Sequence, residues 1–205
     1  MNLVECNFPL IKTSLTRLRD EKSDHEIFRL HVKLISKLLA AELSKQFELR
    51  EHVVSTPLEN TTGYKLLDEI ILLPILRAGL GMLEGFLEVI PQAKSGHIGL
   101  QRNEETLLPE NYYYKIPKSD SPVYIVLDPM LATGGSASEA IRKIKKEGVK
   151  QIFLVSVISA PEGVNKINTD HPDVTVYTAC LDRELNDKGY ILPGLGDAGD
   201  RIFGT

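Results

Sequence analysis

The 205-residue chain lacks several features that define large classes of proteins. Its two cysteines, Cys6 and Cys180, are far apart in sequence and neither belongs to a CxxC pair, so no disulfide scaffold is indicated. The longest apolar run, 70–76, contains Pro74 and is far too short to span a bilayer. The first residues show no basic segment followed by an apolar stretch. We therefore expect a cytoplasmic protein in a reducing compartment, with no membrane partner.

The composition excludes further classes. Apolar residues make up 42% of the chain and charged residues 25%, which is typical of a globular rather than a disordered protein. The net charge of −4 argues against a surface built for nucleic acid, and we expect no nucleic-acid partner. The sequence contains no internal repeat, low-complexity tract or linker, and its length fits a single domain over residues 1–205.

A helix is predicted over residues 24–46, because apolar side chains recur there every three or four positions. These are Ile27, Leu30, Leu34, Leu38 and Ala41. Ser23, followed three residues later by Glu26, fits a capping box at the start of this helix. We expect a helical N-terminal appendage over about residues 1–48, with helices and an oligomer contact in the first 60 residues.

From residue 69 onward, short apolar runs alternate with helical patterns, which is typical of parallel strands covered on both faces. The predicted strands are 69–76, 123–127, 151–158 and 174–181, and the predicted helices are 81–90, 136–146 and 161–168. Two further stretches lie outside this repeat. Residues 94–105 fit a strand, and residues 107–117 fit an antiparallel flap with bounds of about 105–120. The sequence therefore predicts an α/β fold with an open, mainly parallel twisted sheet flanked by helices.

The segment 123–136 leads from a buried strand through Asp128 into a loop of very small residues, before a predicted helix. Free amides at a helix start favour an anion, and Gly134 and Gly135 permit the close approach that a phosphate requires. The hydroxyls of Thr133 and Ser136 can add donors. A tight turn is the simpler explanation of these four small residues alone, but Asp128 suits the vicinal hydroxyls of a ribose phosphate. The Walker A pattern is absent from the chain, which disfavours an ATPase.

This segment resembles the phosphoribosyl pyrophosphate (PRPP) motif of the phosphoribosyltransferases, which is a strand, an acidic pair and a Thr-Gly-rich loop. Pro129 replaces the second acidic residue, and this form is characteristic of the uracil-specific branch of the family. The resemblance implies that PRPP contacts the whole run, namely Asp128, Pro129, Met130, Leu131, Ala132, Thr133, Gly134, Gly135 and Ser136.

Two arginines follow predicted strands. On the residues alone, Arg77 is explained by a surface pair with Glu84, and Arg102 by a solvated loop charge. The family resemblance instead implies that both bind PRPP, with Arg77 in a pyrophosphate loop that contains a cis peptide bond. The run Tyr112–Tyr114 reads alone as an exposed strand edge, whereas the resemblance implies a mobile hood over PRPP.

The segment 194–199 matches the dinucleotide pattern GxGxxG, but it is followed by too few residues for the helix and strand of that motif. Residues 190–200 resemble the uracil-binding loop of uracil phosphoribosyltransferases, within a loop region at about 182–205. The resemblance implies that Ile191, Gly196 and Ala198 contact the base and that Asp197 faces the reacting ribose. Arg77 and Asp197 are then the expected catalytic residues.

The resemblance implies transfer of a phosphoribosyl group from PRPP to uracil, with Mg²⁺ bound mainly through PRPP rather than by protein ligands. It also allows GTP as an activator and a homodimer or homotetramer as the assembly. Three alternatives remain open at this stage: a phosphoribosyltransferase for another base, an RNA-binding regulator on the same fold, and a dinucleotide-dependent oxidoreductase.

Overall fold

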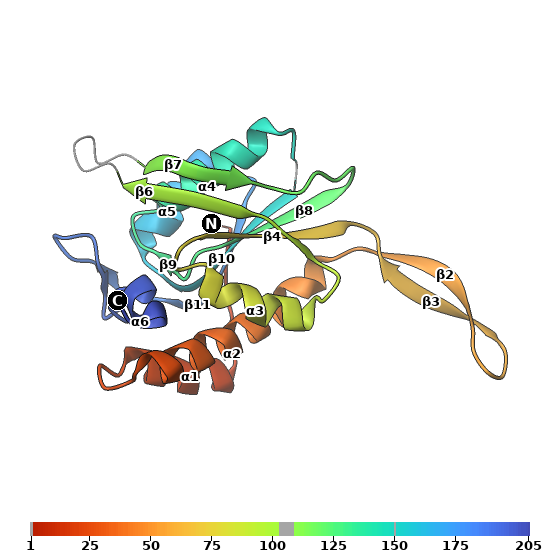
Figure 1. The fold of residues 1–205 in the computed structure, drawn as a ribbon, viewed down its shortest axis with the longest axis horizontal. Coiled ribbons are helices and arrows are strands. Elements are labelled where there is room, and N and C mark those ends of the chain that lie inside the picture. The colour runs from red at the N-terminus through yellow and green to blue at the C-terminus, as the bar shows by residue number, and fades with distance from the viewer. Residues whose placement is uncertain (1, 103–108, 150) are drawn as a thin grey trace.

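A computed structural model describes residues 2–102, 109–149 and 151–205 of the chain. These residues form one nine-stranded central sheet (Figure 1). Its order is β1 (Leu3–Glu5), β11 (Thr175–Leu181), β10 (Gln151–Ser159), β8 (Pro122–Leu127), β4 (Glu69–Leu76), β6 (His97–Arg102) and β7 (Pro109–Lys115), with β5 (Lys94–Ser95) beside β4 and β9 (Met130–Leu131) beside β10. Neighbouring strands are parallel except β6 and β7, which are antiparallel. The predicted mainly parallel α/β sheet is confirmed.

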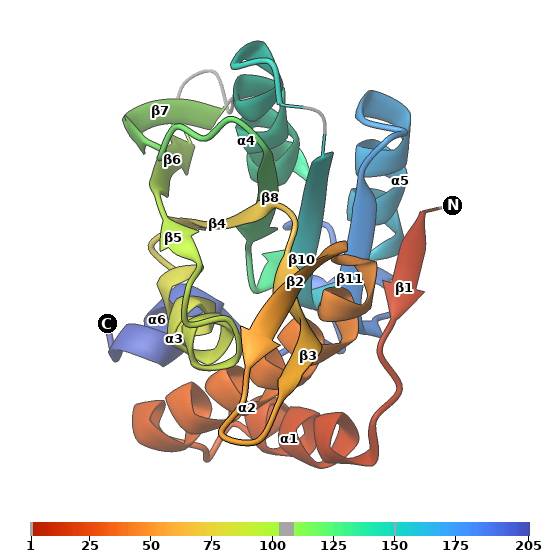
Figure 2. The same cartoon turned by 90° about the vertical axis from the view of Figure 1, so that its right-hand side faces the viewer.

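Helices cover both faces of this sheet (Figure 2). Helices α1 (Pro9–Arg19), α2 (His25–Leu43) and α3 (Leu80–Val89) pack on one face, and α4 (Gly135–Lys146) and α5 (Pro161–Asp170) pack on the other. Successive side chains of a strand point to opposite faces. In β4, Ile70 and Leu72 therefore join the first core and Ile71 and Leu73 the second. Burial on both faces explains why the central strands are mostly apolar.

The predicted helix at 24–46 is confirmed as α2, but its predicted capping box is wrong. Asp24, not Ser23, is the N-cap, and its Oδ1 accepts a hydrogen bond from Ile27 N at 2.9 Å. The Ser23 hydroxyl donates to Arg17 O instead. Both residue types cap helices well, so the sequence did not distinguish the two neighbours. Residues 1–48 also supply part of the main core, through α1, α2 and the short 3₁₀ helix η1 (Ser44–Gln46).

The expectation of helices through residue 60 is wrong at its end. Strands β2 (Leu49–Ser55) and β3 (Asn60–Leu66) form a separate antiparallel hairpin, which projects from the body at the right of Figure 1. Most side chains on both of its faces are exposed. The predicted strand at 94–105 contains β6, which extends the sheet parallel to β4 rather than lying outside the repeat. Part of the predicted flap falls outside the described residues, and β7 is its described strand.

The C-terminal region after β11 is not only loop. It contains the short antiparallel strands β12 (Glu184–Leu185) and β13 (Ile191–Leu192), followed by helix α6 (Ala198–Phe203). Helix α6 packs against α2 and lies at the left of Figure 1, on the side of the molecule opposite the hairpin. None of the helices in the described ranges has both the length and the apolar character needed to cross a membrane.

Candidate active site

Asp128 immediately follows β8, at the carboxyl end of a central strand. Its amide donates to Val155 O at 3.1 Å, which fixes its backbone against β10. The residue as a whole is half-buried. Burial raises the pKa of Asp128 from 3.8 to about 7, and a long hydrogen bond from Met130 N, 3.5 Å, opposes the rise only weakly. The side chain is therefore held where a hydrogen-bonding ligand can reach it.

The small-residue loop after Asp128 is attached to the end of β10. Pro129 O accepts from Val157 N and Ile158 N at 3.1 and 3.0 Å, and Leu131 O accepts from Ala160 N at 2.9 Å. Gly134 caps α4 with a φ of +77°, a left-handed conformation that favours glycine.

The first turn of α4 directs amides and hydroxyls outward. The helix begins at Gly135, and its first amides are not used within the helix. Thr133 and Ser136 are both exposed beside them. The partial positive charge of the helix start adds to these donors. The segment therefore has the polarity and the space for a phosphate group.

Gly163, on α5, is a site residue that sequence reasoning missed. A methyl group added there would lie 2.4 Å from Ala132 O and 2.8 Å from Leu131 O. A methyl group added at Gly134 would lie 3.0 Å from Gly163 O. The two glycines therefore let α5 and the loop touch through their backbones. No local sequence signal points to Gly163, because the contact depends on how α5 packs.

The loop after β4 lies next to Asp128. The peptide bond between Leu76 and Arg77 is cis, as the family resemblance implied. Gly79 packs so tightly that an added methyl group would lie 2.4 Å from Leu127 O. The exposed Arg77 guanidinium lies 3.6 Å from Asp200 Oδ1 and 5.8 Å from the ring centre of Phe203. The alternative pairing of Arg77 with Glu84 is wrong, since Glu84 pairs with Lys33.

The glycine-rich C-terminal loop has a constrained backbone. The bond between Leu192 and Pro193 is cis, and Gly194 and Gly196 have φ values of +67° and +79°. Asp197 is exposed and caps α6, with its Oδ1 accepting from Asp200 N at 3.0 Å. Gly196, expected at the base, and Asp197, expected at the ribose, are both exposed. The side chains of Ile191 and Ala198, also expected at the base, are buried.

The small-residue segment after Asp128, the loop after β4 and the C-terminal loop converge at the carboxyl ends of the parallel strands. A methyl group added at Gly199 would lie 3.9 Å from the Cβ atom of Ala78, which joins the C-terminal loop to the Arg77 loop. One added at Gly189 would lie 3.7 Å from Thr133 Cγ2, which joins the C-terminal loop to the small-residue segment 129–136, hereafter called the phosphate loop. Ligands of open α/β sheets bind beyond the carboxyl ends of the strands, which is where these loops meet.

Comparison with known proteins decides the family. The model of the family described as uracil phosphoribosyltransferase matches residues 5–205. The chain belongs to the uracil phosphoribosyltransferase family. A uracil phosphoribosyltransferase of Salinibacter ruber is 50% identical over 205 residues, which cover 100% of this chain and 98% of the relative. One from Fervidobacterium nodosum is 53% identical over 205 residues, covering 99% of each chain.

Two solved structures show the same fold. A protein from Aquifex aeolicus superposes with a TM-score of 0.93 at 42% identity, covering 98% of this chain and 97% of the other. A hypoxanthine-guanine phosphoribosyltransferase from Bacillus anthracis superposes with a TM-score of 0.52 at 14% identity, covering 78% and 79%. The second likeness shows the shared phosphoribosyltransferase fold alone.

Two features expected from the uracil phosphoribosyltransferase family concern the edge formed by β6 and β7. Arg102 is the last residue of β6, and the prediction for its side chain falls outside the described part of the structure. Tyr112 and Tyr113 on β7 are exposed, and Tyr114 is half-buried. The predicted hood over PRPP stays a prediction.

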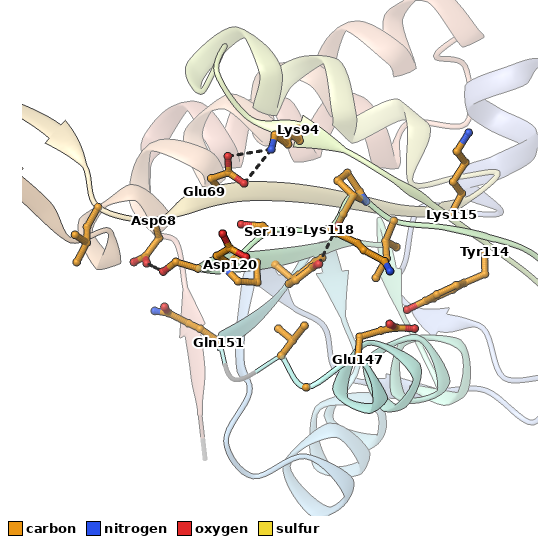
Figure 3. Close-up of a pocket in the computed structure, with 18 residues that line it drawn as sticks. Asp68, Glu69, Lys94, Tyr114, Lys115, Lys118, Ser119, Asp120, Glu147 and Gln151 are labelled. Carbon is orange, nitrogen blue, oxygen red and sulfur yellow. Dashed lines mark hydrogen bonds and ion pairs between the residues drawn. The ribbon is translucent and has the colours of Figure 1, made fainter.

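A large hollow lies at the opposite end of the strands, beside the amino ends of β4 and β8 (Figure 3). Its volume is about 1240 Å³. Three of the charged groups along its wall are already partnered, since Lys94 Nζ lies 2.9 Å from Glu69 Oε1 and Asp68 accepts from Ser121. Although this hollow is large, we place the candidate active site at the carboxyl ends of the strands, because the phosphate loop and Asp128 lie there.

Proposed function

We propose that the chain transfers the 5-phosphoribosyl group of PRPP to N1 of uracil, giving UMP and diphosphate. The supporting observation is the meeting of the phosphate loop, the Arg77 loop and the glycine-rich C-terminal loop in a member of this family. A ribose phosphate, a diphosphate and a planar base each have a suitable partner among them.

In the proposed complex, the 5-phosphate of PRPP lies on residues 132–136 and its ribose hydroxyls donate to Asp128. The diphosphate binds near Arg77 and Arg102, because a guanidinium can hold two phosphate oxygens at once. Uracil lies against Ile191, Gly196 and Ala198. A fixed backbone edge favours uracil over cytosine, because the wrong donor pattern would leave buried polar groups unpaired.

The chemistry requires no covalent intermediate. N1 of uracil attacks C1 of the ribose, the bond from C1 to the diphosphate oxygen breaks, and the N1 proton is lost. Positive charge that develops on the sugar is favoured by the carboxylate of Asp197, and negative charge on the leaving diphosphate by the arginines. Closure of a hood over PRPP would exclude water, which otherwise hydrolyses the same carbon.

Mg²⁺ fits this set of groups as part of the substrate. In the described ranges, no group of three or more His, Cys, Asp or Glu side chains is placed to hold a metal ion. Mg²⁺ typically binds substrate phosphates together with one or two carboxylates, and Asp128 is the carboxylate that follows β8. When bound, the ion supplies charge neutralisation to the diphosphate.

A product assay tests the proposed function. The protein is incubated with PRPP, uracil and Mg²⁺, and UMP and diphosphate are quantified together. We expect equal amounts of the two products and none when uracil or Mg²⁺ is omitted. Diphosphate release without uracil, or release without UMP, would show that the chain performs a different reaction.

The apparent affinity for PRPP should depend on pH through Asp128. Burial raises the pKa of this carboxyl to about 7, so the free protein holds a growing fraction of protonated Asp128 as the pH falls. Only the carboxylate accepts bonds from both ribose hydroxyls. We therefore expect KM for PRPP to rise about tenfold between pH 8 and pH 6. The control is Asp128→Asn, in which KM for PRPP should vary with pH only through the titration of PRPP itself. If KM varies with pH in the same way in the variant and in the unmodified protein, Asp128 is not the group that titrates.

We also propose that the β2–β3 hairpin contacts a second copy of the chain in a homodimer or homotetramer. An isolated two-stranded hairpin is marginally stable in water, yet this one exposes Val53 at 74%, Leu58 at 95% and Tyr64 at 60%. The double variant Val53→Asp and Leu58→Asp should reduce the mass measured by light scattering to that of one 22.8 kDa chain. Leu10→Asp, at an exposed position of α1, is the control. An unchanged mass in the double variant would place the contact elsewhere.

A further inference from the structure

Gly194, in the glycine-rich loop, has both backbone groups held by one ion pair. Its amide donates to Asp182 Oδ2 at 3.0 Å, and its carbonyl accepts from Arg19 Nη1 at 2.8 Å. Arg19 and Asp182 in turn bind each other through both carboxylate oxygens, at 2.9 and 2.5 Å. The Asp182 side chain is 3% exposed. A methyl group added at Gly194 would lie 2.1 Å from Ile191 O, so the turn is fixed sterically as well.

Arg201, on α6, holds the next part of the same loop. Its Nη1 donates to Leu195 O at 2.9 Å and also to Leu18 O. Its Nη2 donates to Asp20 O at 2.7 Å and to Ser23 O at 3.2 Å, in the turn between α1 and α2. The guanidinium lies 4.5 Å from the ring centre of Phe28 on α2. One side chain thus joins the loop to the two N-terminal helices.

Gly196 is the first loop residue beyond these contacts. The protein itself binds the amide and carbonyl of Gly194 and the carbonyl of Leu195. Gly196 is exposed, and its backbone groups form no hydrogen bond with any other described residue. Its φ of +79° orients these free groups. The chain therefore uses three backbone groups of Gly194 and Leu195 to fix the position of the two free groups of Gly196.

We infer that Arg19, Asp182 and Arg201 are positioning residues for base recognition, which set the backbone edge of Gly196 that a pyrimidine reads. This inference rests on the proposed function. None of the three needs to touch the base. Their effect passes through the loop backbone, because displacement of about 1 Å at a recognition edge is enough to lose well-aligned hydrogen bonds.

The sharpest variant is Arg19→Lys. Lysine keeps the positive charge next to Asp182, but a single ammonium cannot span two carboxylate oxygens and the Gly194 carbonyl in the fixed fork of arginine. The matched control is Arg142→Lys, at an exposed arginine of α4 that pairs with Glu139 on its own helix. Both variants keep the net charge and are compared at equal folded fraction, checked by thermal unfolding.

Two ligands separate base recognition from phosphate binding. UMP and ribose 5-phosphate share the phosphate and the sugar, and only UMP carries the base. We expect Arg19→Lys to weaken UMP binding about tenfold while ribose 5-phosphate binding changes less than about twofold. In the assay, KM for uracil should rise, KM for PRPP should not, and the preference for uracil over cytosine should fall. Arg142→Lys should change none of these.

If Arg19 has a purely structural role, Arg19→Lys should lower the unfolding temperature and leave the affinity of the folded protein for both ligands unchanged. That result would overturn the inference. An equal loss for UMP and ribose 5-phosphate would overturn it too. If Arg19→Lys does not fold, Asp182→Asn undergoes the same pair of titrations with the same expected split. Failure of the unmodified protein to bind UMP would refute the proposed function itself, a result distinct from either of these.

Discussion

Asp128→Asn should lower kcat/KM for PRPP about a hundredfold, because two hydrogen bonds from ribose hydroxyls to a carboxylate contribute ~1.5–3 kcal/mol each and an amide retains only part of this. The substitution keeps the side-chain volume and an oxygen that accepts from Met130 N. The measurement is the initial rate against PRPP concentration at pH 8. Asp120→Asn, at an exposed residue at the opposite end of the strands, is the control and should leave the rate unchanged.

The same substitution should stabilise the ligand-free protein. Burial raises the folded-state pKa of Asp128 from 3.8 to about 7, so the stability that this group contributes is fully present below pH 3.8, falls as the pH rises from there to about 7, and is lost above that. Asparagine carries no charge to bury. Allowing for the partial exposure of the group, we expect Asp128→Asn to raise the free energy of unfolding by about 2 kcal/mol at pH 8 and by little at pH 5.

Denaturant titration at the two pH values measures this difference. A variant less active and also less stable at pH 8 would show that Asp128 supports the fold rather than the ligand. A gain in stability together with a loss of activity is expected of a residue whose buried charge destabilises the ligand-free protein but is needed to bind the ligand.

Gly163→Ala should disable the phosphate loop from a residue outside it. The added methyl group would lie 2.4 Å from Ala132 O, a backbone atom that moves only with the loop. We expect ribose 5-phosphate affinity to fall at least about tenfold, and overpacking to lower the free energy of unfolding by about 1–3 kcal/mol. Alanine is otherwise favoured over glycine within a helix, so a loss cannot come from helix propensity.

Calorimetric titration with ribose 5-phosphate checks this prediction. Asn165→Ala, at an exposed position of the same helix, is the control and should bind as the unmodified protein does. Unchanged affinity in Gly163→Ala would mean that the loop does not need its contact with α5 in order to hold a phosphate.

The parts of the fold that the sequence predicted are those whose cause is local. Strands β4, β8 and β10 are mostly apolar on both faces because both faces are covered, so each stands out in the sequence as a dense apolar run. The β2–β3 hairpin gave no such signal, since nearly all of its side chains are exposed and many are polar. Helix α2 was found from its period of apolar residues, whereas the choice between Ser23 and Asp24 as its cap depended on one residue of register.

The candidate site divides in the same way. Asp128 and the small residues after it are contiguous, so the order of strand, acid, loop and helix was visible in the sequence. Gly163 and Arg19 were not, because their partners are distant along the chain: Arg19 and Asp182 are separated by 163 positions. A family resemblance identifies the residues inside a ligand-binding motif. It does not identify the side chains from distant parts of the chain that fix the position of that motif.

The most direct test of the proposed function is the rate of diphosphate release from PRPP and Mg²⁺ with uracil, cytosine, hypoxanthine and adenine supplied one at a time. A phosphate loop and Asp128 alone would serve any base, so the choice of base tests the C-terminal loop. The proposed function predicts rapid release with uracil and, with each of the other three, a rate no higher than without a base. Equal rates with all four bases, or release with a purine and none with uracil, would contradict it.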